Sequence, residues 1–249
     1  AGLKVGHVDN DAVTLAAKLG YGAVGLRALP AAPGGDFDPL IEDKALLRET
    51  QARIADTGVG VFDVEIVRLA PDFAVERFRP FLDVCGALGA KAVLVAGDDP
   101  DEARLTASYA AFCDAAAPHG LSADLEFMPW TNVPDCKSAL RIVRAAGRPN
   151  GRILVDALHA GRSTTTLADL AAIPRERLHY AQICDAHGAG PAPDPDAARA
   201  EGVRARLVPG DGDLPVREFI AALPASTILA VEAPLEGQAD PADPEALAA

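Results

Sequence analysis

The chain lacks the cysteine pattern, the long apolar run and the leader sequence that mark several common classes of protein. Its four cysteines lie far apart with no CxxC pair, which argues against a disulfide scaffold or a zinc knuckle and predicts reduced thiols. No apolar run approaches the roughly 20 residues that a membrane span needs, and the first residues show no signal-peptide pattern. We therefore expect a cytoplasmic protein with no membrane partner.

Positive charge is also scarce, since the chain has 23 basic and 36 acidic residues and a formal net charge of −13. The electrostatic field of an acidic protein repels phosphate backbones, which argues against a nucleic-acid partner. The glycine-rich G-x-G-x-x-G and P-loop patterns are absent as well, so the sequence gives no basis for nucleotide binding. A small-molecule partner, without a recognisable phosphate-binding motif, is the remaining expectation.

What the chain does contain is a regular alternation of short apolar runs and amphipathic stretches. With 249 residues, of which 49% are hydrophobic and 24% charged, it can bury a large core. Apolar residues recur at helical spacing in segments such as 43–58, 74–90 and 103–120. Several of these predicted helices end at glycines that suit helix caps. The predicted strands are 3–6, 23–29, 60–67, 92–97, 122–128, 153–157, 179–185 and 228–233.

Eight such repeats in a chain of this length predict an α/β protein with a single (β/α)8 TIM barrel over residues 1–249. The first strand is short, as though a few leading residues were missing or trimmed. The alternative is an open doubly wound sheet, which the missing glycine-rich loop disfavours. Residues 188–204 predict a long loop after the seventh strand, of the kind that often forms a lid. The polar tail 236–249 is expected to be a surface segment or the start of a last helix.

Oxygen-bearing side chains stand at the ends of four consecutive predicted strands. They are Glu126, Asp156, Gln182 and Glu232. In a barrel of this class the active site is built at these strand ends. Three ionised carboxylates at one mouth would repel one another unless a divalent cation neutralises them, and the oxygen-rich set favours Mn²⁺ or Mg²⁺, with Co²⁺ as a substitute. A single such acid is more often salt-bridged or a helix cap, but four in succession favour metal binding.

Further polar residues lie close to these strand ends. His159 follows Asp156 by three residues, where it can face a substrate, although a capping or surface histidine is the alternative. Arg162 is equally compatible with a solvated loop. Glu65 and Arg68, near the end of the third strand, either line the pocket or pair with each other.

The stretches "DLEFMPW", "ILVDALHAGRS", "HYAQICDA", "RLVPGDGDLP" and "ILAVEAP" resemble the xylose isomerase-like TIM barrels, the sugar phosphate isomerase/epimerase superfamily. The resemblance spans the chain, with specific motifs only in the second half. It implies that Glu126, Asp156, Gln182 and Glu232 hold one divalent metal ion. It also implies that His159 touches substrate and that Arg206, before the P-G-x-G turn, binds a substrate oxygen or carboxylate.

The activity that the resemblance implies belongs to the branch of hydroxypyruvate isomerase, ketose 3-epimerases and 3-dehydroshikimate dehydratase. A metal chelated by a hydroxyketone, a sugar or a keto acid, would stabilise an enediolate. Glu126 and Glu232 would then remove and return a proton, giving an isomerase or an epimerase. Loss of a β-hydroxyl instead would make the protein a dehydratase, which stays open as an alternative.

Two functions outside this chemistry, a binding protein and a nuclease, fit the sequence less well. A non-catalytic sugar-binding barrel also remains open, although the intact acid set counts against it. The endonuclease branch of the superfamily holds three metals with a histidine-rich shell, and the five histidines and acidic charge of this chain disfavour it. Barrels of this group often form dimers or tetramers, so a homo-oligomer is expected.

Overall fold

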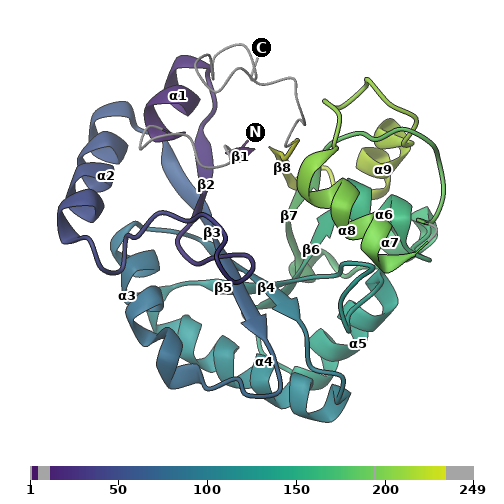
Figure 1. Ribbon diagram of the computed structural model, residues 1–249, viewed down its shortest axis with the longest axis horizontal. Helices are drawn as coiled ribbons and strands as arrows, with labels where there is room; N and C mark the ends of the chain where they lie inside the picture. The colour runs from purple at the N-terminus through teal and green to yellow at the C-terminus, as the bar shows by residue number, and fades with distance from the viewer. Residues whose placement is uncertain (1, 5–11, 193, 234–249) are drawn as a thin grey trace.

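The computed structural model describes residues 2–4, 12–192 and 194–233, and these form a closed parallel barrel in which the strands follow one another in chain order. β1 closes the barrel by pairing with both β2 and β8. The predicted (β/α)8 architecture is therefore confirmed (Figure 1). The strands are β1 Gly2–Lys4, β2 Ala23–Arg27, β3 Gly60–Leu69, β4 Ala92–Gly97, β5 Ser122–Glu126, β6 Gly151–Asp156, β7 Leu178–Ile183 and β8 Ile228–Val231.

The helices lie around the outside of the barrel, as Figure 1 shows. They are α1 Ala12–Lys18, α2 Lys44–Thr57, α3 Arg79–Ala87, α4 Glu102–Ala116, α5 Cys136–Ala146, α6 Ala157–Arg162, α7 Leu167–Ala171, α8 Pro195–Arg204 and α9 Val216–Ala222. The predicted glycine caps occur at Gly58 and Gly120, whose φ angles of 73° and 72° are left-handed. None of the described helices is long and apolar enough to cross a membrane.

Two of the predicted helices are shorter than their apolar periodicity suggested. The segment 74–90 begins with a 3-10 turn, and α3 starts only at Arg79, with Pro80 at its N-terminus. The segment 103–120 leaves α-helical geometry after Ala116, because Pro118 lacks the N–H that would continue the hydrogen-bond ladder. Both helices still present their apolar faces to the barrel.

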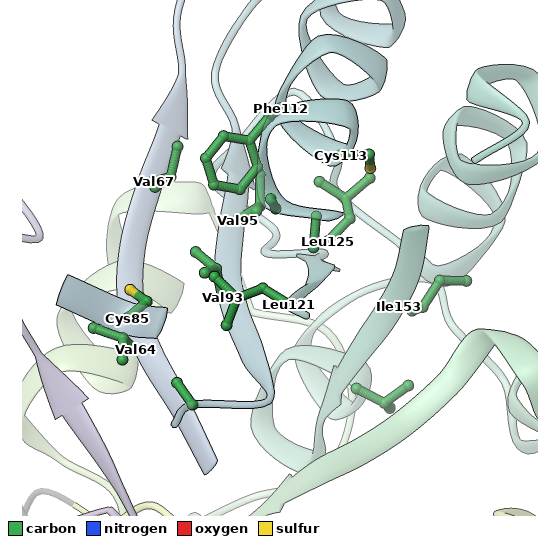
Figure 2. Packing of buried hydrophobic residues seen from close by; sticks show 14 of the residues in the cluster. Val64, Val67, Cys85, Val93, Val95, Phe112, Cys113, Leu121, Leu125 and Ile153 are labelled. Carbon is green, nitrogen blue, oxygen red and sulfur yellow. The ribbon is translucent and has the colours of Figure 1, made fainter. Parts of the chain in front are cut away.

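The main core lies between the outer face of the barrel and the helices. In Figure 2, Phe112 and Cys113 of α4 lie against Val95 and Leu125 of β4 and β5, and all are buried in one hydrophobic cluster. All four cysteines are free and buried. This agrees with the prediction of reduced thiols.

A smaller cluster fills the interior of the barrel and fixes which side chains reach its mouth. Leu154, Tyr180 and Ala230 belong to it. Because side chains alternate along a strand, the residues two positions further on also point inward. Those residues are Asp156, Gln182 and Glu232, so ordinary strand geometry directs them to the inside of the mouth.

The prediction of an irregular loop over residues 188–204 is wrong for its second half. Asp194 caps α8 by accepting a hydrogen bond from the backbone N–H of Ala197 at 2.8 Å, and Pro195 occupies the first turn. The abundance of Pro and Gly hid this short helix. The predicted tail, 236–249, lies outside the described residues.

Asp124 of β5 is a fully buried carboxyl on the inward side of the barrel, with the Nδ1 atom of His179 3.7 Å from its Oδ2 atom. Burial raises its pKa to about 7, and the Ser122 hydroxyl and Arg152 offset only part of that rise. Between about pH 4 and pH 7, the Asp124 carboxyl is therefore protonated in the folded protein but already ionised in the unfolded chain. Stability therefore falls as pH rises toward 7 and levels off above it.

We expect Asp124→Asn to remove this dependence, because the amide does not titrate. One pKa unit corresponds to about 1.4 kcal/mol, so between pH 5.5 and 7 the wild type should lose about 2 kcal/mol relative to the variant. Urea unfolding at several pH values measures the difference. Asp83→Asn is the control, since the Asp83 side chain is 75% exposed. Parallel curves for wild type and Asp124→Asn would contradict a neutral, buried Asp124.

Candidate metal centre and active site

The structure brings the four predicted ligand residues to one end of the barrel. Glu126 and Asp156 are the last residues of β5 and β6, Gln182 lies next to the end of β7, and Glu232 directly follows β8. The strand pairing sets Asp156 level with Gln182. The backbone N–H of Glu232 extends the ladder by donating to the carbonyl of Ile183 at 3.0 Å. Four oxygen-bearing side chains thus come from four adjacent strands.

Gln182 has an arrangement that protein contacts do not explain. Its side chain is fully buried, yet among the described residues neither the amide oxygen nor the amide nitrogen has a hydrogen-bond partner. A buried amide without partners costs free energy comparable to a lost hydrogen bond or more. An amide oxygen is a hard donor like the carboxylates on the neighbouring strands, so the donor set fits a hard divalent cation.

Glu126, Asp156 and His159 form a tight group of side chains that could hold a metal ion. Each offers a ligand atom, and these atoms lie within 4.8 Å of one another. The His159 Nε2 atom is 3.6 Å from Glu126 Oε1, and its Nδ1 atom is 3.8 Å from Asp156 Oδ1. All three side chains are buried. His159 was predicted to face substrate, and the structure places it close enough to the carboxylates to contact either a metal ion or a ligand bound to one.

Helix α6 begins directly at the end of β6, and this explains the position of His159. Asp156 is the N-cap residue of α6, and its Oδ1 atom accepts a hydrogen bond from the backbone N–H of His159 at 3.0 Å. The capping interaction that was the alternative to metal binding is therefore present. This hydrogen bond uses one lone pair of the Asp156 carboxylate, and the remaining lone pairs can still accept further contacts.

Arg206 is buried in the site and pairs with Asp156. Its Nη1 atom is 2.6 Å from Asp156 Oδ2, and Nη2 is 3.9 Å from Glu232 Oε1. Burial raises the pKa of Asp156, but Arg206 and His159 outweigh it and hold the pKa below its ordinary value. The carboxylate therefore stays ionised, which is the form in which a carboxylate could bind a metal ion. Arg206, predicted to bind substrate, also contacts two of the predicted ligand residues.

Glu65 lies at the mouth but does not pair with Arg68. Its partner is Arg27 at the end of β2, at 3.0 Å, whereas Arg68 forms an ion pair with Asp98 at the end of β4. The pKa of Arg27 is raised, chiefly by Glu65 and further by Glu232 and Glu126, so Arg27 lies within the field of the site. Sequence reasoning missed Arg27, although its position at the C-terminal end of a predicted strand was a usable signal.

Asp185 holds the turn after Arg206. Its carboxylate accepts hydrogen bonds from the backbone N–H groups of Ala186, Gly210 and Leu214 at 2.8 to 3.0 Å. Among the other uncertain residues, Arg162 is not a solvated loop residue, because it is buried in an ion pair with Glu201. Glu201 carried no signal in the sequence, since its partner is 39 residues away.

The fold and site define a (β/α)8 barrel whose mouth carries an acidic candidate metal centre. The chain belongs to the xylose isomerase-like TIM barrel family, whose model matches residues 13–249. This confirms the resemblance recognised in the sequence. No curated protein matches the sequence significantly.

Solved structures share the fold at low sequence identity. A fusion of a xylose isomerase-like TIM barrel with 4-hydroxyphenylpyruvate dioxygenase is 19% identical with a TM-score of 0.79, over 96% of this chain and 39% of that one. This chain thus spans well under half of the fusion protein. The IolI protein with a zinc atom is 17% identical, TM-score 0.74, over 93% and 88% of the two chains. D-Allulose 3-epimerase from Methylomonas sp., in complex with D-allulose, is 18% identical, TM-score 0.67, over 93% and 83%.

Proposed function

We propose that the protein is a divalent-metal-dependent isomerase or epimerase that acts on a hydroxyketone, either a sugar or a keto acid. The observation that carries this proposal is the inward set of Glu126, Asp156, Gln182 and Glu232, in which the buried Gln182 amide has no partner among the described residues. The family is consistent with it, and the neighbours include a zinc-containing protein and an epimerase. We propose Mn²⁺ or Mg²⁺ as the metal from the oxygen-rich ligand set.

The proposed chemistry needs a polarised carbonyl and two proton-transfer groups. Glu126, Asp156, Gln182 and Glu232 would hold the divalent cation, which would supply a Lewis acid for the carbonyl of the substrate. Glu126 and Glu232 stand on β5 and just after β8, with β6 and β7 between them in the barrel order. They therefore approach a substrate from different sides, so that one removes the proton and the other returns it.

The remaining residues of the mouth position the substrate. His159, at 3.6 Å from Glu126, can donate to a substrate hydroxyl beside the glutamate that moves the proton. Arg206 and the Arg27–Glu65 pair offer further polar groups at the mouth. Return of the proton to the opposite face gives epimerisation, and its return to the neighbouring carbon gives isomerisation.

The test is deuterium exchange in D₂O with the Mg²⁺-loaded protein, followed by NMR, with a parallel activity assay on Mn²⁺-loaded protein. Hydroxypyruvate, a panel of free ketoses and 3-dehydroshikimate serve as substrates, and metal-stripped protein is the control. We expect deuterium at the carbon next to the carbonyl of one substrate, only when metal is present. A dehydrated product would assign the protein to the lyases instead. Stoichiometric metal binding without any exchange would contradict the proposal and favour a binding protein.

A further inference from the structure

Helix α6 places a second buried residue beside His159. Residues 159 and 162 are three positions apart and so lie on the same face of the helix. Both are buried, His159 at 2% and Arg162 at 7% exposure. That face meets α8, which lies beside α6 in Figure 1. Arg162 therefore shares its surroundings with a residue of the candidate active site without touching the strand-end acids.

The Arg162 guanidinium is fully engaged in holding the segment after β7. Its Nε and Nη2 atoms form a two-pronged ion pair with Glu201 of α8, at 2.6 and 2.8 Å. Nη2 also donates to the carbonyl of His187 at 2.8 Å, and Nη1 donates to the carbonyls of Gly188 and Gly190 at 3.0 Å. These contacts use all five N–H groups of an arginine, in a planar fork that lysine cannot reproduce.

The helix that Glu201 anchors covers the candidate site. A Cβ atom placed on the next residue, Gly202, would lie 2.8 Å from the Trp130 ring and 3.5 Å from His159 Cε1, so the backbone of α8 closely approaches both. Trp130 in turn meets the His159 ring edge-on, with centroids 4.8 Å apart. The carbonyl of Gly202 accepts the Nε–H of Arg206 at 2.8 Å. Helix α8 is thus tied to α6 on one side and to the Asp156 partner on the other.

We propose that Arg162 is a positioning residue that latches α8 over His159 and Arg206 and so closes the mouth of the barrel over a bound ligand. A segment that covers an active site must open to admit substrate, and such segments are held by few contacts. Here the Glu201 ion pair and three carbonyl contacts converge on one side chain. The closure itself does not depend on the reaction; its effect on catalysis rests on the proposed function.

Trp130 gives a direct probe of closure, because it is the only tryptophan of the chain and lies under Gly202. We expect Arg162→Ala to increase acrylamide quenching of Trp130 fluorescence by at least about twofold, since release of α8 exposes the ring. Arg162→Lys should give a smaller increase and Glu201→Gln the smallest, because each retains part of the contact set. Arg141→Ala is the control, as it removes an exposed two-pronged pair with Glu102 on α4 and α5.

Unchanged quenching in all three latch variants would overturn the proposal. Should Arg162→Ala fail to fold, the two conservative variants decide the matter, because both retain polar groups of similar size. Once a substrate is known, Arg162→Lys should raise KM at least about tenfold while kcat falls less, since lost closure weakens ligand retention more than proton transfer. A fall in kcat with unchanged KM would contradict the latch, whereas absence of any activity would bear on the proposed function alone.

Discussion

Glu232→Gln is expected to lower the rate of carbon-bound proton exchange by about 10²- to 10⁴-fold, the usual contribution of a positioned acid or base. Glutamine keeps an oxygen that can contact a cation but cannot take up a proton. Glu126→Gln should produce a loss of similar size. Both variants should still fold, because the substitution preserves shape and removes one negative charge from a mouth that holds Glu65, Glu126, Asp156 and Glu232.

The measurement is deuterium incorporation at saturating metal, with metal content determined on the same samples. Glu218→Gln on the exposed surface of α9 is the matched control and should leave the rate unchanged. If both Glu126→Gln and Glu232→Gln exchanged protons at more than about a tenth of the wild-type rate, neither glutamate would carry the transfer that general acid–base catalysis requires.

Arg206→Met is expected to destabilise the metal-free protein by about 3–5 kcal/mol, the usual cost of leaving a buried charge without its partner. Asp156 is fully buried, and Arg206 Nη1 lies 2.6 Å from its Oδ2 atom. The substitution also removes the donors to the carbonyls of Gly202 and Glu232. Methionine fills much of the volume, so the loss reports chiefly on charge and hydrogen bonding.

Saturating Mn²⁺ should recover much of this loss, because a ligand that binds only the folded state stabilises it by mass action. Urea unfolding with and without Mn²⁺ measures both effects. Arg141→Met is the control, since its pair with Glu102 has side chains 56% and 51% exposed and should contribute about 1 kcal/mol or less. Equal losses in Arg206→Met and Arg141→Met would show that Asp156 does not depend on Arg206 for its charge.

Asp156→Asn combined with Arg206→Met separates the charge from the packing. Removing both partners should cost less than removing Arg206 alone, because no carboxylate is then left unpaired. The double variant should also fail to recover stability on addition of Mn²⁺, since a carboxylate ligand is lost.

Sequence patterns alone define the barrel and the polar residues that stand at its strand ends. Alternating apolar runs and helical periodicity define eight β-α units. Because every second residue of a strand points the same way and strand ends are where such barrels carry chemistry, Glu126, Asp156, Gln182 and Glu232 were identifiable before any contact was known. Their common position at the barrel mouth reflects one local rule applied four times.

The partner that each charged side chain takes follows from the three-dimensional fold and not from spacing along the chain. Glu65 was three residues from Arg68, yet it pairs with Arg27, because adjacent parallel strands set those two residues level while Arg68 reaches Asp98. Arg162 and Glu201 are 39 residues apart, and a helix hidden within a stretch rich in Pro and Gly brings them together. Ion pairs depend on distance in space, and no periodicity in the sequence encodes contacts between separate βα units.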